Sequence, residues 1–99
     1  MAVLVGIFGP STASAYVDVN VPTTVGTCIK VGVSRDYRTG GNYRARIRIQ
    51  ALSGRTSWSK RVVAPKRGWR FYKICPKPGG YKVIYNYNGS KDIYHVRVI

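Results

Sequence analysis

Within residues 43–52, apolar and polar residues alternate without a break from Tyr43 to Ala51, the clearest structural pattern in the chain. One parity is apolar and the other carries arginine or glutamine: Tyr43, Ala45, Ile47, Ile49 and Ala51 against Arg44, Arg46, Arg48 and Gln50. Successive side chains of a β-strand point to opposite faces, so the pattern predicts a strand with one buried and one cationic face. Residues two apart on a strand are separated by roughly 6.6 Å, so the three arginines form a regular ladder.

Shorter runs rich in valine, isoleucine and tyrosine indicate further strands, and glycine, proline and asparagine separate them. These strands are expected within residues 16–21, 27–35, 57–63, 69–75, 81–87 and 92–99. The sequence Asn88-Gly89-Ser90 is the clearest hairpin turn in the chain, and Pro76-Lys77-Pro78-Gly79-Gly80 is expected to form a rigid turn. About seven short strands in 99 residues predict one all-β domain, either an antiparallel sandwich or a small barrel.

The first fifteen residues differ from the rest of the chain. An apolar run over residues 2–8 is followed by Gly9-Pro10 and by small residues that end in Ala13-Ser14-Ala15. This order is typical of the end of a secretory signal peptide cut before Tyr16, although no Lys or Arg precedes the apolar run. We therefore interpret residues 1–15 as a signal-peptide remnant and residues 16–99 as a single β-sandwich domain of a secreted, extracellular protein. An ordinary N-terminal strand is the alternative.

Cys28 and Cys75 are the only cysteines. In an exported chain the simplest expectation is one intramolecular disulfide, whereas in a reducing compartment they would be two buried thiols. The strand number, the cysteine pair on an early and a late strand, and the terminal hairpin resemble secreted bacterial immunoglobulin-like β-sandwiches. The resemblance implies an antiparallel immunoglobulin-like sandwich of about seven strands in which a disulfide joins the two sheets. Cys28 has the opposite parity to Ile29, which predicts a bridge near the end of a sheet.

The charge balance is extreme, with seventeen Lys and Arg residues against three aspartates and a net charge of +14. Such self-repulsion costs stability, so it predicts an anionic partner or surface; the alternative is a solubility device or an environment that supplies counter-ions. Ten of the cations are arginine, which favours bidentate contacts with phosphate or carboxylate. The candidate anion-binding residues are Arg44, Arg46, Arg48, Lys60, Arg61, Lys66, Arg67 and Arg70. The candidate aromatic contacts beside them are Trp58, Trp69 and Tyr85.

The residues that usually perform catalysis are scarce. His95 is the only histidine and lies in an alternating strand, which is typical of a surface or half-buried position. Two cysteines and one histidine do not make a spaced zinc set, and no pair of carboxylates is placed for acid–base work. We therefore expect no enzyme activity, no metal and no cofactor.

The favoured function is that of a secreted, non-catalytic binding protein that recognises anionic cell-envelope or extracellular polymers through the arginine-lined strand. Teichoic acid, acidic polysaccharide and anionic lipid are the expected partners, because the Coulomb attraction does not discriminate among polyanions. Three alternatives remain: a secreted antimicrobial or toxin-like protein, a nucleic-acid-binding domain, and a structural protein that assembles through open sheet edges. The sequence predicts no particular protein partner.

Overall fold

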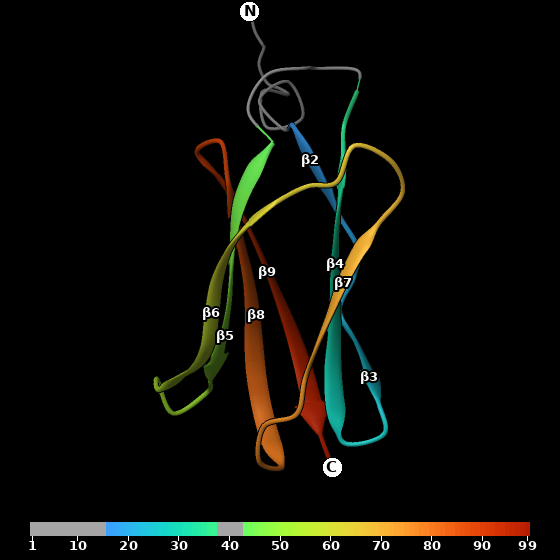
Figure 1. Ribbon diagram of the computed structural model, residues 1–99. Helices are drawn as coiled ribbons and strands as arrows, with labels where there is room; N and C mark the ends of the chain where they lie inside the picture. Colours follow the sequence, from blue (N-terminus) through green and yellow to red (C-terminus); the bar gives the residue numbers. More distant parts are fainter. Residues whose placement is uncertain (1–15, 38–42) are drawn as a thin grey trace, which may run out of the picture.

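Two antiparallel sheets face each other in the computed structural model, which describes residues 16–37 and 43–99 (Figure 1). The described residues contain no helix that could cross a membrane. The signal-peptide interpretation concerns residues 1–15, which lie outside the described residues, as do residues 38–42. The expectation of an all-β, antiparallel sandwich is confirmed.

The first sheet is built around β4 (Cys28–Arg35), whose alternating residues give one buried face. Both β2 (Val17–Val19) and β3 (Thr23–Val25) pair with the same edge of β4, one after the other. On the opposite edge of β4 lies β7 (Arg70–Ile74). All of these pairings are antiparallel.

The second sheet has the strand order β6 (Thr56–Val63), β5 (Arg44–Ala51), β8 (Gly79–Tyr87) and β9 (Ser90–Val98). The ladder strand β5 is therefore an inner strand with neighbours on both sides. The β8–β9 hairpin closes through Asn88 and Gly89, whose φ angles of 47° and 79° are both left-handed. Such angles are those of a type I′ turn, so the predicted hairpin is confirmed.

The core fills the space between the sheets. Its fully buried members come from the inward parity of each strand and include Ile29, Val31, Val33, Ile47, Ile49, Val83 and Tyr85. The apolar parity of residues 43–52 therefore faces the core, as the alternation predicts. Burying an aliphatic side chain of this size contributes about 1.5–3 kcal/mol, so the core is what holds the two sheets together.

The disulfide forms between Cys28 and Cys75, as expected, but it lies within one sheet. Cys28 begins β4 and Cys75 follows β7, and the register pairs Ile29 with Ile74 beside them. The bridge thus joins neighbouring strands at the end of the first sheet, as the parity of Cys28 predicted. The expectation that it joins two sheets is wrong, because Cys28 lies on the parity opposite to the buried Ile29 and cannot reach the facing sheet.

Two further details differ from the sequence analysis. The short strand β3 is an eighth strand among the described residues, and it folds back onto β4 through a turn at Gly26 with φ of 63°. Gly79 and Gly80 belong to β8 instead of the predicted turn. A side chain at Gly80 would lie 2.6 Å from Leu52 Cδ1, so glycine leaves the room that Leu52 needs against the sheet.

Candidate anion-binding face

The ladder arginines point away from the core, on the outer surface of the second sheet. Arg44 and Arg46 are exposed and Arg48 is half-buried, while Ala45, between Arg44 and Arg46, is buried. The predicted orientation of the three arginines is therefore confirmed. Because β5 has neighbours on both sides, the ladder lies inside a wider surface and not at an edge.

The register brings further polar groups beside the ladder. Arg46 pairs with Arg61 of β6 on one side and with Asn86 of β8 on the other. Asn86 in turn pairs with Lys91 of β9. Neighbouring strands are about 4.8 Å apart, so these four side chains form a row across the sheet about 14 Å long.

The next row includes two apolar groups. Arg48 pairs with Ser59 on one side and Ile84 on the other, and Ile84 pairs with Ile93. Ile84 has the outward parity of β8, yet it is only 5% exposed, so neighbouring side chains cover it. The Nε atom of Arg48 is buried without a hydrogen-bond partner among the described residues.

Three lysines and arginines that sequence reasoning missed complete this surface. Lys82 pairs with His95, and Arg97 pairs with Gly80, while Lys91 ends the row described above. The alternation of β9 that includes Lys91 and Arg97 resembles that of the ladder, but only the strand order shows that all three residues share its face. We call this surface the cationic face and define it by Arg44, Arg46, Arg48, Arg61, Lys82, Lys91 and Arg97.

None of the three aspartates lies on the cationic face. Asp92 has the inward parity of β9, and its Oδ2 accepts a hydrogen bond of 2.5 Å from the hydroxyl of Tyr87. Asp18 belongs to β2 in the first sheet, and Asp36 is buried just after β4. The three aspartates therefore lie off the outer surface of the second sheet, which carries the cationic face.

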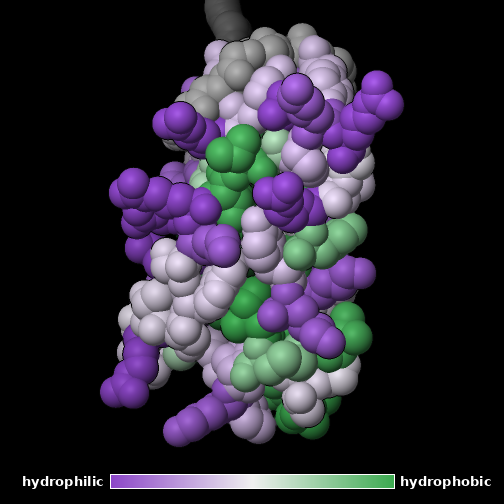
Figure 2. All heavy atoms as spheres, in the orientation of Figure 1, coloured by the Kyte–Doolittle hydropathy of each residue, from purple (hydrophilic) through white to green (hydrophobic). Residues whose placement is uncertain are grey.

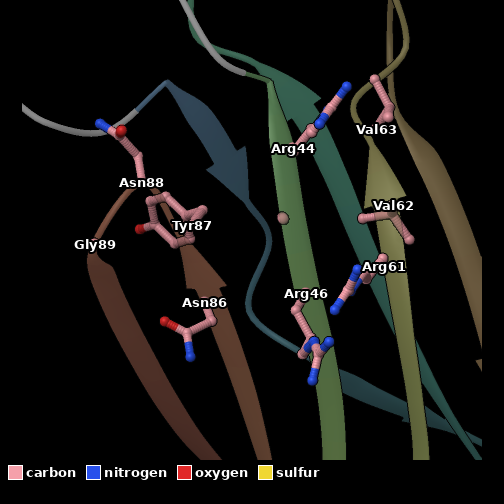
Figure 3. A pocket seen from close by; sticks show the side chains of 10 residues that line it. Arg44, Arg46, Arg61, Val62, Val63, Asn86, Tyr87, Asn88 and Gly89 are labelled. Carbon is pink, nitrogen blue, oxygen red and sulfur yellow. The ribbon is translucent and has the colours of Figure 1, made fainter.

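An open hollow lies at one end of the cationic face (Figure 3). The backbone pairing between β5 and β8 ends at the Arg46–Asn86 pair, and the hairpin turn beyond this pair is not paired with β5. The hollow between them measures about 520 Å³. Arg44, Arg46 and Arg61 line it from β5 and β6, and Asn86 lines it from β8.

The other predicted basic residues lie elsewhere. Lys60 has the inward parity of β6, and its Nζ is 5.7 Å from the ring centroid of Tyr72 in β7. Lys66 and Arg67 belong to the connection between β6 and β7, and Arg70 begins β7 in the first sheet. Hydrophilic side chains accordingly project along both margins of the molecule in Figure 2. The predicted basic set is thus divided between the two sheets.

The three aromatic candidates have different surroundings. Trp58 is half-buried against Tyr72, with ring centroids 5.9 Å apart, and helps to join β6 to β7. Tyr85 is fully buried, so the prediction that it contacts a ligand is wrong; its ring fills the core because it shares the parity of Val83. Trp69 is 45% exposed. Only Trp69 of the three presents much of its ring to solvent.

Trp69 stacks on Phe71, which lies on the outer face of the first sheet. The ring centroids are 6.1 Å apart with an interplanar angle of 20°, and Lys30 Nζ lies 4.4 Å from the Phe71 centroid. Phe71 pairs with Gly32, where a Cβ atom would lie 2.6 Å from the ring, so the ring rests against bare backbone. The exposed aromatic pair and the arginine ladder therefore lie on opposite faces of the sandwich.

Comparison with protein-family models, curated proteins and solved structures finds no match for this chain. Within residues 16–37 and 43–99, no group of three or more His, Cys, Asp or Glu side chains is placed to hold a metal ion. His95 lies on the outer parity of β9 opposite Lys82. The cationic face carries guanidinium, ammonium and amide groups, which are groups that can bind anions.

Proposed function

We propose that this protein binds anionic polymers, without catalysis, through the cationic face. One observation carries the proposal: the register of four strands gathers seven Lys and Arg side chains on a sheet surface that holds none of the chain's aspartates. Rows of charge spaced by roughly 6.6 Å along the strands present a surface to many charged groups of one polymer at once. Contacts of this kind steer and bind polyanions by charge.

The energetic argument supports the same proposal. Arg46 and Arg61 lie directly opposite each other, an arrangement that destabilises a sheet when both side chains carry the same charge. An anion bound between them offsets that repulsion. Five of the seven cations are arginine, whose planar fork forms paired hydrogen bonds with phosphate and carboxylate.

The proposed setting is extracellular, and the proposed partners are polymers of the cell envelope or its surroundings. The Cys28–Cys75 disulfide supports this setting, because disulfides persist mainly in oxidising compartments. Teichoic acid, acidic polysaccharide and anionic lipid all carry the required charge. Single-stranded nucleic acid fits less well, because it is typically bound by stacking platforms within the basic groove, and Trp69 and Phe71 lie on the other sheet.

A salt titration over a panel of polymers tests the proposal. The panel contains teichoic acid, heparin-like polysaccharide, anionic vesicles, single-stranded DNA and duplex DNA, each titrated between about 50 and about 200 mM salt. We expect an envelope-type polymer to remain bound at the upper end while DNA binding falls away. Failure of every polyanion to bind at the lower end would contradict the proposal.

A further inference from the structure

The hollow at the end of the cationic face is lined by several hydrogen-bond donors. Figure 3 shows Arg44 and Arg46 on β5, Arg61 on β6, and Asn86 on the hairpin beside them. Three of the seven cations of the cationic face therefore line one hollow. None of the described residues that line it is acidic.

Three strands position these donors. Arg46 stands between Arg61 and Asn86 in the row that crosses the sheet, so a group above Arg46 is within reach of both neighbours. Asn86 is exposed, and its amide provides both a donor and an acceptor. The arrangement combines two opposed guanidinium groups with a neutral hydrogen-bonding side chain.

The walls of the hollow are partly apolar and differ from an open charged surface. Val63, which is 49% exposed, forms one side, and the ring of Tyr87 forms another. The hydroxyl of Tyr87 is engaged with Asp92, so Tyr87 offers the hollow its ring rather than its hydroxyl. Sites for small organic molecules measure about 300–1,000 Å³, and this hollow of about 520 Å³ is in that range.

We infer that the hollow binds a phosphate monoester carried on a small organic unit, such as the terminal phosphate of a polyol-phosphate polymer. A phosphate monoester offers three strong acceptor oxygens, enough for the forks of Arg46 and Arg61 together, whereas a carboxylate or a phosphodiester within a chain offers two. The apolar walls and the amide of Asn86 then contact the organic unit. This inference rests on the proposed function and names the group that the cationic face recognises.

Titration of the folded protein with glycerol 3-phosphate tests the inference by NMR. We expect the backbone amide of Gly89 and the side-chain amide of Asn86 to shift in a saturable manner, with unmodified glycerol producing no such shift. Titration with inorganic sulfate shows how much of the binding is due to charge without the organic unit. Titration with glycerophosphoglycerol compares a phosphate within a chain with the terminal phosphate of glycerol 3-phosphate. We expect glycerol 3-phosphate to bind more tightly, and tighter binding of glycerophosphoglycerol would overturn the assignment to a terminal phosphate.

A matched pair of variants locates the binding. Arg61→Gln removes a cation from the hollow, and Arg97→Gln removes a cation of the same face that pairs with Gly80 outside the hollow. We expect Arg61→Gln to weaken glycerol 3-phosphate binding by about tenfold or more, since a charge-assisted hydrogen bond is lost. Arg97→Gln is expected to change it by about twofold at most.

The outcomes separate this inference from the proposed function. Equal weakening by both variants, or no saturable shift in the wild-type protein, would overturn the inference even if polymers still bind the cationic face. Saturable shifts at Gly89 and Asn86 that disappear in Arg61→Gln support it, whatever the polymer panel shows. Loss of all polymer binding with these shifts retained would contradict the proposed function alone.

Discussion

Arg46 lies directly across from Arg61 in the antiparallel register of β5 and β6, with both side chains on the outer face of the sheet. The Cβ atoms of such partners are about 4.5–5.5 Å apart, and like charges in this position destabilise the sheet. Asn86, the partner of Arg46 on the other side, carries no charge that could compensate. The Arg46–Arg61 pair therefore lowers the stability of the folded protein when no anion is bound.

Arg46→Gln is expected to stabilise the free protein by about 0.2–1 kcal/mol at low salt, because it removes this repulsion. The gain should shrink as salt screens the charges of the wild-type protein. Urea unfolding at two salt concentrations measures both effects. Arg97→Gln is the control, since Arg97 pairs with Gly80 and has no charged partner in that row; an equal gain there would contradict the explanation.

Reduction of the disulfide is expected to lower the free energy of unfolding by roughly 4 kcal/mol, from the entropy of closing a loop of 47 residues. Urea unfolding with and without reductant measures the difference. Since β7 pairs only with β4 among the described strands, its amides are expected to lose more exchange protection on reduction than those of β8. Uniform loss of protection would argue against a local role of the bridge.

Tyr87→Phe is expected to destabilise the protein by about 1–3 kcal/mol at neutral pH, because the hydrogen bond to Asp92 is lost. Burial and that hydrogen bond raise the pKa of Tyr87 well above its ordinary value of 10. The folded protein thus retains a proton that the unfolded chain loses, so the contribution of Tyr87 is complete below pH 10 and declines as the pH rises further.

Urea unfolding between pH 8 and pH 11 measures this dependence. The wild-type protein should lose stability above pH 10 more steeply than Tyr87→Phe, where this linkage is absent. Tyr37→Phe provides the control, at a ring that is 64% exposed. A Tyr87→Phe variant with the same alkaline slope as the wild type would show that other groups cause the decline.

Replacing both Trp69 and Phe71 by alanine is expected to leave the binding of heparin-like polysaccharide within about twofold, because the aromatic pair lies on the sheet opposite the cationic face. Binding of single-stranded DNA should change as little. Fluorescence anisotropy with labelled polymers measures both affinities. A selective loss of DNA binding by more than about tenfold would instead favour the nucleic-acid function, since base stacking contributes about 1–3 kcal/mol per base.

Alternation alone was enough to predict the orientation of Arg44, Arg46 and Arg48, because a period of two fixes the face of each side chain. The Asn88-Gly89 hairpin was equally predictable from its turn residues. Local patterns of this kind need no knowledge of neighbouring strands. They establish the all-β class and the direction of the charged face.

The full set of residues on the cationic face could not be predicted, because it depends on pairing between strands that are far apart in the sequence. Lys82 and Arg97 join the arginines only because β8 and β9 lie beside β5 in that order. The same limitation affected Cys28 and Cys75, whose strands are neighbours in one sheet and not members of two. The parity of Tyr85, shared with Val83, did contain the information that it is buried.

The salt dependence of polymer binding tests the central claim most directly. Two variants with equal loss of charge are compared with the wild type: Arg44→Gln, Arg46→Gln and Arg48→Gln together, and Lys66→Gln, Arg67→Gln and Arg70→Gln together. The first set lies on the cationic face, and the second lies between β6 and β7 and at the start of β7.

For each protein, the logarithm of the binding constant for teichoic acid is plotted against the logarithm of the salt concentration. We predict that the first variant has a slope shallower by about two to three, one for each lost phosphate contact, while the second changes by less than about one. Equal changes in the two variants would contradict the claim, because they would mean that net charge, and not the cationic face, binds the polymer.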